Sequence, residues 1–413
     1  MILTLVILLL CLFWGLPVAV ALACSSLAAA VFFLDLPLEF LASKMLGAVY
    51  SFPLAAVPLF LLGGELLVQS GFTARLVKVS SILGEKLHLG LASVTIFVAF
   101  FLSGLTGAAV AETAALGSVL YPALKKSNYP SAYSATLIAA SSTLGPIIPP
   151  SIPLIIYGLM AQTSIASLFA AGILPGVLTA VGIFAINLPR EKHRKINREK
   201  GTLTEVLLEI CWVVLPPLFL ILVMLTGFLT ITETAMGFVI LGGIYLFSSD
   251  KGMVKLPGTL LRASLAAAQV LIIIACAAAF SFCLTLFDLT GMFAQLMHAF
   301  PAEKIGFWLI LNIGLLLLGT FLETTAAIYL IVPAVLPIAE VLGISPVHLG
   351  IVLVYNLVLG MMTPPFGITL FVSSSVSGTP IRSIFVQVWP FLLVGLTVLA
   401  LLGLFPEWMI IKL

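Results

Sequence analysis

Charge is what this sequence has least of. Only 8% of its 413 residues are charged and 62% are hydrophobic, whereas an ordinary soluble domain has about 25% charged residues. Several apolar runs reach the roughly 20 residues that are needed to cross a hydrocarbon core about 30 Å thick. The composition therefore excludes a water-soluble globular protein and predicts an all-α polytopic membrane protein.

The chain also lacks the motifs of common enzymes. It has no GxxxxGK[ST] loop, so we expect no ATP hydrolysis in this chain, and it has no HExxH, no GxSxG and no GxGxxG in a strand–helix context. The five cysteines lie in apolar segments and form no CxxC or Cys/His cluster, which argues against a disulfide framework or a metal centre. These absences predict a protein that is not an enzyme and needs no cofactor.

Basic residues are missing from the centre of every apolar run, and the net charge of +2 suggests no nucleic-acid partner. An anionic substrate in the membrane would therefore depend on the positive ends of half-helices and on bound cations. It would also depend on polar side chains, for which the candidates are Thr106, Ser151, Asn356 and Thr363.

Two apolar segments, 88–126 and 304–341, are nearly twice the length of a single span, and each is interrupted near its middle. The interruptions are Ser103–Gly107 and Gly319–Thr324. Each segment is either a pair of full spans or one re-entrant helical hairpin that enters and leaves on the same side.

The distribution of basic residues separates these alternatives, because cytoplasmic connections carry an excess of Lys and Arg. With two re-entrant hairpins and Met1 in the cytoplasm, all but three of the 18 Lys and Arg residues fall on the cytoplasmic side. The exceptions are Lys44, Lys304 and Lys412. The sequence thus predicts two hairpins and nine membrane crossings, with Leu413 in the periplasm.

The two hairpins are alike in sequence. Glu112-Thr113-Ala114-Ala115 is followed by Pro122, and Glu323-Thr324-Thr325-Ala326 by Pro333, each proline ten residues after the glutamate. A double proline comes 37 residues after Glu112 and 41 residues after Glu323. Similar units in opposite orientations are the inverted repeat of many secondary transporters.

This repeat divides the chain into five parts. Met1–Phe33 has no basic n-region, so we interpret it as a retained helix and not as a signal peptide. The predicted parts are an N-terminal scaffold helix in 1–44, repeat 1 in 45–188 with hairpin 88–126 and broken helix 131–162, a basic cytoplasmic linker in 189–204, scaffold helices in 205–261, and repeat 2 in 262–413 with hairpin 304–341 and broken helix 346–377.

Prolines within the broken helices predict cation sites. A proline removes the helical partner of the carbonyl four residues earlier, so Ser142, Gly145 and Pro146 should have free carbonyls in the first break, and Gly360 and Met361 in the second. Such oxygens beside hydroxyl groups suit a small hard cation, and we predict one sodium site for each repeat. The first comprises Ser103, Gly104, Gly107, Ser142, Gly145 and Pro146, and the second comprises Gly319, Thr320, Thr324, Gly360, Met361 and Thr363.

We predict a substrate cavity between the sites, lined by Thr106, Pro150, Ser151, Glu323 and Asn356. The roles of the carboxylates at membrane depth stay open at this point. Glu112 and Glu323 either cap a helix or coordinate an ion, since each lies in the first turns of the hairpin's second helix. For Glu65 and Glu233 a packing or gating role is expected.

At these residues the sequence resembles the large membrane subunit of the tripartite ATP-independent periplasmic (TRAP) transporters, the DctM-like family. The likeness covers almost the whole chain. It is strongest over SGLTGAAVAETAALGSVLYPALKK (103–126), SSTLGPIIPPSIPLIIYG (141–158), TITETAMG (230–237) and 319–375, which contains TPPFGITLFVSSS. The chain departs from the family in having glutamate at 112 and 323, where aspartate is expected more often.

The resemblance implies an elevator-type fold in the bacterial inner membrane that imports organic-acid anions such as dicarboxylates, keto acids or sialic acid. Sodium would be the coupling ion and the only metal. It also implies two protein partners, a periplasmic substrate-binding protein and a small four-helix membrane subunit, which should be a separate polypeptide. The alternative is a stand-alone sodium/divalent-anion symporter. An ion channel or a membrane enzyme lacks support, since no continuous polar pore or clustered acid/base pair is evident.

Overall fold

The computed structural model describes residues 2–86, 89–191, 203–249, 252–287 and 303–405, and within these ranges the chain is helical without strands. The elements are α1 (Ile2–Phe13), α2 (Val18–Phe32), α3 (Leu38–Val49), η1 (Phe52–Ala55), α4 (Ala56–Gln69), α5 (Phe72–Lys86), α6 (Leu91–Thr106), α7 (Ala109–Lys126), α8 (Ser131–Ser141), η2 (Ser142–Leu144), α9 (Ile152–Met160), α10 (Ile165–Glu191), α11 (Leu203–Thr226), α12 (Ile231–Phe247), α13 (Gly252–Leu286), α15 (Glu303–Phe321), α16 (Thr324–Val341), α17 (Pro346–Gly360), α18 (Ile368–Ser377), α19 (Ile381–Gln387) and α20 (Trp389–Leu404). Most of the predicted linker 189–204 lies outside the described residues.

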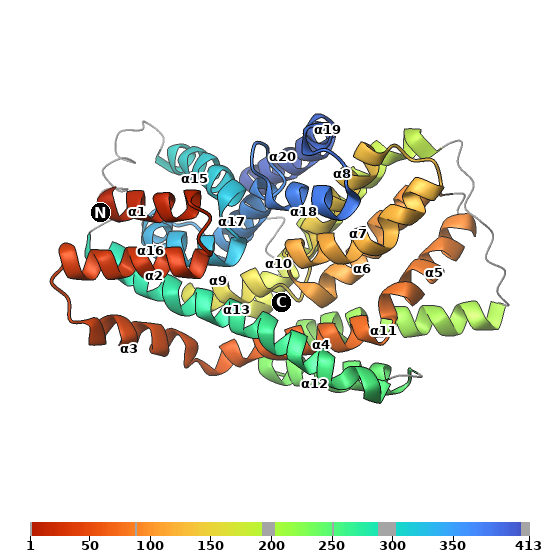
Figure 1. Cartoon of the computed structure of the whole chain (residues 1–413), viewed down its shortest axis with the longest axis horizontal. Coiled ribbons are helices and arrows are strands. Elements are labelled where there is room, and N and C mark those ends of the chain that lie inside the picture. Colours follow the sequence, from red (N-terminus) through yellow and green to blue (C-terminus); the bar gives the residue numbers. More distant parts are fainter. Residues whose placement is uncertain (1, 87–88, 192–202, 250–251, 288–302, 406–413) are drawn as a thin grey trace.

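The helices form two layers (Figure 1). We call α1–α5 and α11–α13 the scaffold layer, in which the long helix α13 packs against α2, α3 and α4, and α12 packs along α4. We call α6–α10 and α15–α20 the core layer, which contains both predicted hairpins and both broken helices. Residue 262, where repeat 2 was predicted to begin, lies within α13.

The N-terminal segment differs from the prediction, because the expected single scaffold helix over 1–44 is three helices. The chain turns after α1 at Gly15, whose φ of +78° is left-handed, and α2 starts after Pro17. Glycine adopts this conformation without strain, and proline favours a new helix start. As a result α1 and α2 lie side by side (Figure 1), and α3 begins after Pro37.

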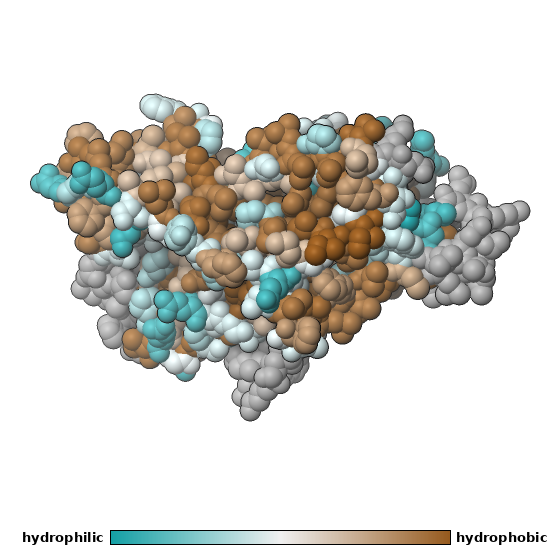
Figure 2. Space-filling view, turned by 90° about the horizontal axis from the view of Figure 1, so that it is seen from below, coloured by the Kyte–Doolittle hydropathy of each residue, from teal (hydrophilic) through white to brown (hydrophobic). Residues whose placement is uncertain are grey.

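The described helices include several that are long and apolar enough to cross a membrane. Five qualify by length and composition, and the bent pair α19–α20 adds a sixth. Figure 2 shows hydrophobic side chains over much of the face seen from below. On the scaffold layer, large apolar residues such as Ile240 and Leu261 are exposed (60% and 61%). A surface of this kind suits contact with lipid, and the chain is a multi-pass membrane protein.

Two carboxylates of the scaffold layer stabilise its packing and helix ends. Glu65 forms an ion pair with Arg262 at 2.5 Å, which joins α4 to α13. Glu233 accepts hydrogen bonds from the backbone and side chain of Thr230, and the Thr230 hydroxyl accepts one from the Glu233 amide, so the two residues form a capping box at the start of α12.

At the centre of the core layer the two broken helices interlock. The second half of the first, α9, packs on α16 and α17, and the second half of the other, α18, packs on α7 and α8. The Tyr157 hydroxyl of α9 donates to the Pro346 carbonyl at 2.6 Å, and the Ser373 hydroxyl of α18 donates to the Ala135 carbonyl at 2.6 Å. Each repeat thus holds a half-helix of the other, and the core layer is a single packed unit.

The two predicted hairpins are packed differently. The helices α6 and α7 contact each other along their length. By contrast α15 packs mainly on α17, and a cavity of about 220 Å³ lies between α15 and α16. That cavity is lined by apolar residues, among them Phe307, Leu315 and Val335. The arms of the second hairpin are therefore held apart by their neighbours. That either hairpin is re-entrant stays a prediction.

Candidate functional site

The tip of the first hairpin rests on the backbone of the first break. Gly107 ends α6 in a left-handed conformation (φ +60°), and its N–H donates to the Ser103 carbonyl at 3.2 Å. A Cβ atom at this position would lie 3.1 Å from the Pro150 carbonyl oxygen and 3.3 Å from the Ile152 nitrogen. Glycine therefore serves both the turn and the close approach. The contact also brings the N-termini of α7 and α9 together.

Oxygen-bearing side chains from α7 meet the same break. The hydroxyl oxygens of Thr113 and Ser142 lie 2.5 Å apart, and both residues are fully buried. Glu112 is also 0% exposed, and its Oε2 lies so close to Gly145 that it would clash with a Cβ there. A carboxylate and two hydroxyls thus converge on the segment Ser142–Gly145, where the α-helix α8 has ended. Hard oxygen donors of this kind suit a small cation.

The three carbonyls that were predicted to be free in the first break differ in the hydrogen bonds that they accept. The Ser142 carbonyl accepts the Gly145 N–H at 3.2 Å, and the Pro146 carbonyl accepts the Ser151 hydroxyl. The Gly145 carbonyl receives no hydrogen bond from the described residues. Because a carbonyl oxygen has two lone pairs, all three keep acceptor capacity, and Gly145 keeps the most.

The second tip and the second break also meet. A Cβ on Gly360 would lie 2.6 Å from the Cα of Gly319 and 2.8 Å from the Leu316 carbonyl oxygen. The Thr324 hydroxyl donates to the sulfur of Met361 at 3.2 Å. The structure therefore brings Gly319, Thr324, Gly360 and Met361 together, and that they bind a cation stays a prediction.

The remaining polar groups of the second site are bound within their own segments. The Thr320 and Thr363 hydroxyls donate to carbonyls of the preceding turn at 2.7 and 2.8 Å. The Met361 carbonyl accepts both the amide (3.1 Å) and the hydroxyl (2.9 Å) of Thr369. The Gly360 carbonyl accepts the Thr363 N–H at 2.9 Å. Both carbonyls that were predicted to be free in the second break therefore accept hydrogen bonds from described residues, unlike the Gly145 carbonyl of the first break. Both double prolines, Pro149–Pro150 and Pro364–Pro365, contain a cis peptide bond.

The residues of the predicted substrate cavity have separate surroundings. Pro150 and Ser151 lie at the first break, where the Ser151 hydroxyl caps α9 by accepting the Leu154 N–H at 3.2 Å. Asn356 is fully buried, and its amide nitrogen donates to the carbonyl (2.9 Å) and side-chain oxygen (2.7 Å) of Asn312 on α15. The burial and contacts of residues 104–106 lie outside the described part, and the Ser103 hydroxyl donates to the Phe100 carbonyl at 2.6 Å.

The two matched glutamates have different roles. Glu323 is the N-cap of α16 and accepts the amide and the hydroxyl of Thr325, both at 3.0 Å. Glu112 lies inside the first turn of α7, against Gly145. Sequence reasoning left Glu112 and Thr113 out of the first site, although the Glu-Thr-Ala-Ala match to the second hairpin was the signal that could have placed them there.

Long apolar helices around two interlocked, broken and buried helices define this protein as a membrane transport protein. Residues 5–408 match the family model described as "Tripartite ATP-independent periplasmic transporter, DctM component". The chain belongs to this family.

Relatives agree with this assignment, and a solved transporter structure has a similar fold. The chain is 32% identical to the isethionate TRAP transporter permease protein DctMQ of Oleidesulfovibrio alaskensis, over 95% of the chain but only 63% of that protein's length. It is 31% identical to the sialic acid TRAP transporter large permease protein SiaM of Vibrio cholerae, over 96% of the chain and 94% of that protein. Its fold is similar to that of the Alcanivorax borkumensis YdaH transporter, with a TM-score of 0.61 at 16% identity over 90% and 89% of the two chains.

Proposed function

We propose that this chain is the large permease subunit of a sodium-driven TRAP transporter that imports a small organic-acid anion. Family membership supports the permease role. The observation that supports cation coupling is the first break, where the buried Glu112 carboxylate lies against Gly145 and the buried Thr113 and Ser142 hydroxyls meet in the same segment.

The proposed mechanism has two sodium sites, one at each tip–break contact. A cation bound at a break would be drawn to both the tip and the break, and would place positive charge beside the substrate anion. Sodium should therefore tighten substrate binding, and substrate should tighten sodium binding by the same factor. The interlocked core layer would carry both sites as one body against the scaffold layer, in an elevator movement.

The proposed substrate is an organic-acid anion of the dicarboxylate, keto acid or sialic acid class. Isethionate and sialic acid, which two relatives carry in their names, are both acid anions. At the first tip the N-termini of α7 and α9 lie together, and the positive ends of their dipoles favour negative charge.

The proposed partners are a small four-helix membrane subunit and a periplasmic substrate-binding protein, and the proposed location is the bacterial inner membrane. Reconstitution into proteoliposomes tests these points together. We expect uptake of the organic acid only with both partners present and an inward sodium gradient. Sodium-driven uptake by the purified single chain would instead establish the stand-alone symporter.

The proposed topology places Ser127, at the end of α7, in the cytoplasm. The charge distribution carries this expectation. A cysteine at this position should react with a membrane-impermeant maleimide only in inside-out vesicles. Reaction in intact spheroplasts would overturn the hairpin topology.

A further inference from the structure

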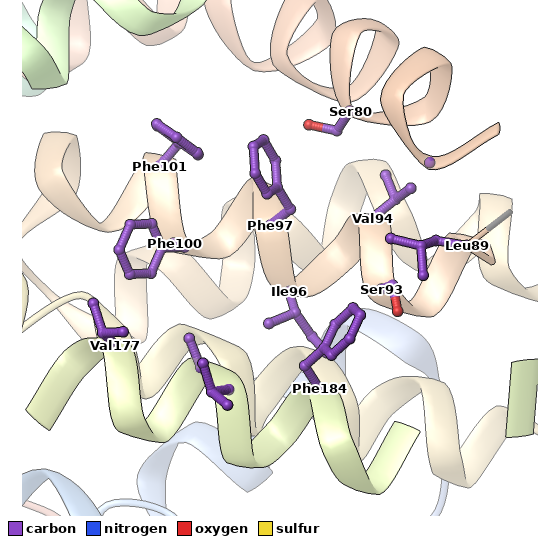
Figure 3. A pocket seen from close by; sticks show the side chains of 13 residues that line it. Ser80, Leu89, Ser93, Val94, Ile96, Phe97, Phe100, Phe101, Val177 and Phe184 are labelled. Atoms are coloured by element: carbon purple, nitrogen blue, oxygen red, sulfur yellow. The ribbon is translucent and has the colours of Figure 1, made fainter. Parts of the chain in front are cut away.

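A groove of about 390 Å³ lies along the boundary between the two layers. Figure 3 shows it between α5 of the scaffold layer and α6 and α10 of the core layer. Its walls are almost entirely apolar, and the aromatic rings of Phe97, Phe100, Phe101 and Phe184 line it from α6 and α10. It is separate from both tip–break contacts.

The chemistry of these walls excludes water and the substrate anion as stable occupants. A buried water needs two to four polar partners, and apolar cavities that lack such partners take up apolar molecules. None of the described residues that line the groove is charged, so a carboxylate among them would lack a compensating charge. Since interiors are otherwise close-packed, an apolar ligand is the occupant that suits it.

The groove opens at an apolar part of the protein surface. Three of its lining residues are exposed at its rim, namely Phe97 (41%), Val177 (37%) and Val181 (59%). Val177 and Val181 lie in the middle of α10, one of the helices long and apolar enough to span the membrane. At that depth the surrounding medium consists of lipid acyl chains.

A single polar group marks one side of the groove. Ser80 on α5 is only 2% exposed, and its hydroxyl has no hydrogen-bond partner among the described residues. Ser93, across the groove, already accepts the Asn187 amide at 3.2 Å. A buried hydroxyl without a partner is costly, and an acceptor oxygen on the occupant would satisfy it.

We infer that this groove binds one acyl chain of a membrane phospholipid, with the ester carbonyl of that chain accepting a hydrogen bond from Ser80. The inference requires only that the chain is embedded in a bilayer, and does not depend on the proposed sodium coupling.

Photolabelling tests the inference on the permease in nanodiscs, together with its small subunit. The probe is a phospholipid with a diazirine in one acyl chain, and labelled peptides are identified by mass spectrometry. We expect labelling of the α6 and α10 peptides that contain Phe97 and Phe184. The substitution Val177→Trp should abolish it by filling the groove. The matched control is Val119→Trp on α7, where the valine is similarly exposed (41%) but does not line the groove, and it should leave labelling unchanged.

The hydroxyl is tested separately. Ser80→Ala should lower groove labelling roughly fivefold, as expected for one hydrogen bond. Ser118→Ala, which removes an exposed hydroxyl bonded to its own helix, should have no effect. If groove labelling persists in Val177→Trp, the label comes from lipid at the protein surface and not from lipid in the groove. If the groove is not labelled, and a cysteine in place of Phe97 cross-links to the small subunit, the occupant is a protein. Either result overturns the inference.

Discussion

Replacing Gly360 with alanine should abolish uptake and strongly reduce the amount of folded permease. The new methyl group would lie 2.6 Å from the Cα and 2.7 Å from the carbonyl carbon of Gly319, and 2.8 Å from the Leu316 carbonyl oxygen. These are backbone atoms, so no side-chain rotation relieves the overlap. Forced overpacking costs about 1–3 kcal/mol or more, and here α15 must move away from α17, which would open the second tip–break contact.

Helix α15, against which Gly360 packs, offers a matched control. A Cβ at Gly314 on α15 would meet no atom within 4 Å, so Gly314→Ala should leave both stability and uptake near wild type. Thermal unfolding in detergent, followed by size-exclusion chromatography, and uptake in proteoliposomes are the measurements. If Gly360→Ala has the melting temperature and uptake of Gly314→Ala, the close crossing of α15 and α17 is not a feature of the folded protein.

Much of the core layer follows from local signals in the sequence. Left-handed glycines and helix-breaking prolines act on their own segment, so the breaks after α8 and α17 and the turns at Gly107 and Leu322–Glu323 were predictable without tertiary information. The contact of each tip with its break was predictable because a hairpin with the Glu-Thr motif is followed by a double proline in both halves of the chain.

The hydrogen bonding within the breaks was not predictable in this way. Prolines indicate which carbonyls lose a helical partner, but not which side chains replace it. Ser151 folds back onto the Pro146 carbonyl, and Thr369 reaches the Met361 carbonyl from the next helix. Both depend on how the chain leaves the break. In the second predicted site the Gly360 and Met361 carbonyls both already accept hydrogen bonds, and the sequence alone does not show this.

The matching sequence motifs around Glu112 and Glu323 also did not show that the two carboxylates have different structural roles. Glu112 and Glu323 each precede a threonine and stand ten residues before a proline. The helix starts at Thr324 in one hairpin but at Ala109 in the other, so Glu323 is an N-cap and Glu112 lies within the first turn. A shift of a few residues in the helix start changes what a carboxylate can reach. Similarly, hydropathy merged α1 and α2 into one segment because the four residues between them are mostly apolar.

Replacing Glu112 with glutamine should raise the sodium concentration needed for half-maximal uptake by at least about tenfold, with little change in stability. The substitution keeps the side chain's volume beside Gly145 and removes its negative charge. A full charge about 4 Å from a cation contributes roughly 4 kcal/mol at an effective dielectric of about 20. Each 1.4 kcal/mol corresponds to about tenfold in affinity. Desolvation of the carboxylate offsets part of the roughly 4 kcal/mol, but the expected loss of sodium affinity is still at least about tenfold.

Glu323→Gln is the matched control, because it changes the same residue type at the corresponding position of the sequence motif in the other hairpin. Glutamine keeps an acceptor oxygen for the Thr325 amide, so this variant should lose less than about 1 kcal/mol of stability and keep the wild-type sodium dependence. The measurements are sodium titrations of uptake in proteoliposomes and thermal unfolding of both variants. Wild-type sodium dependence in Glu112→Gln would show that the Glu112 carboxylate serves packing alone. An equal loss in both variants would show that the two carboxylates act alike, contrary to the different positions that α7 and α16 give them.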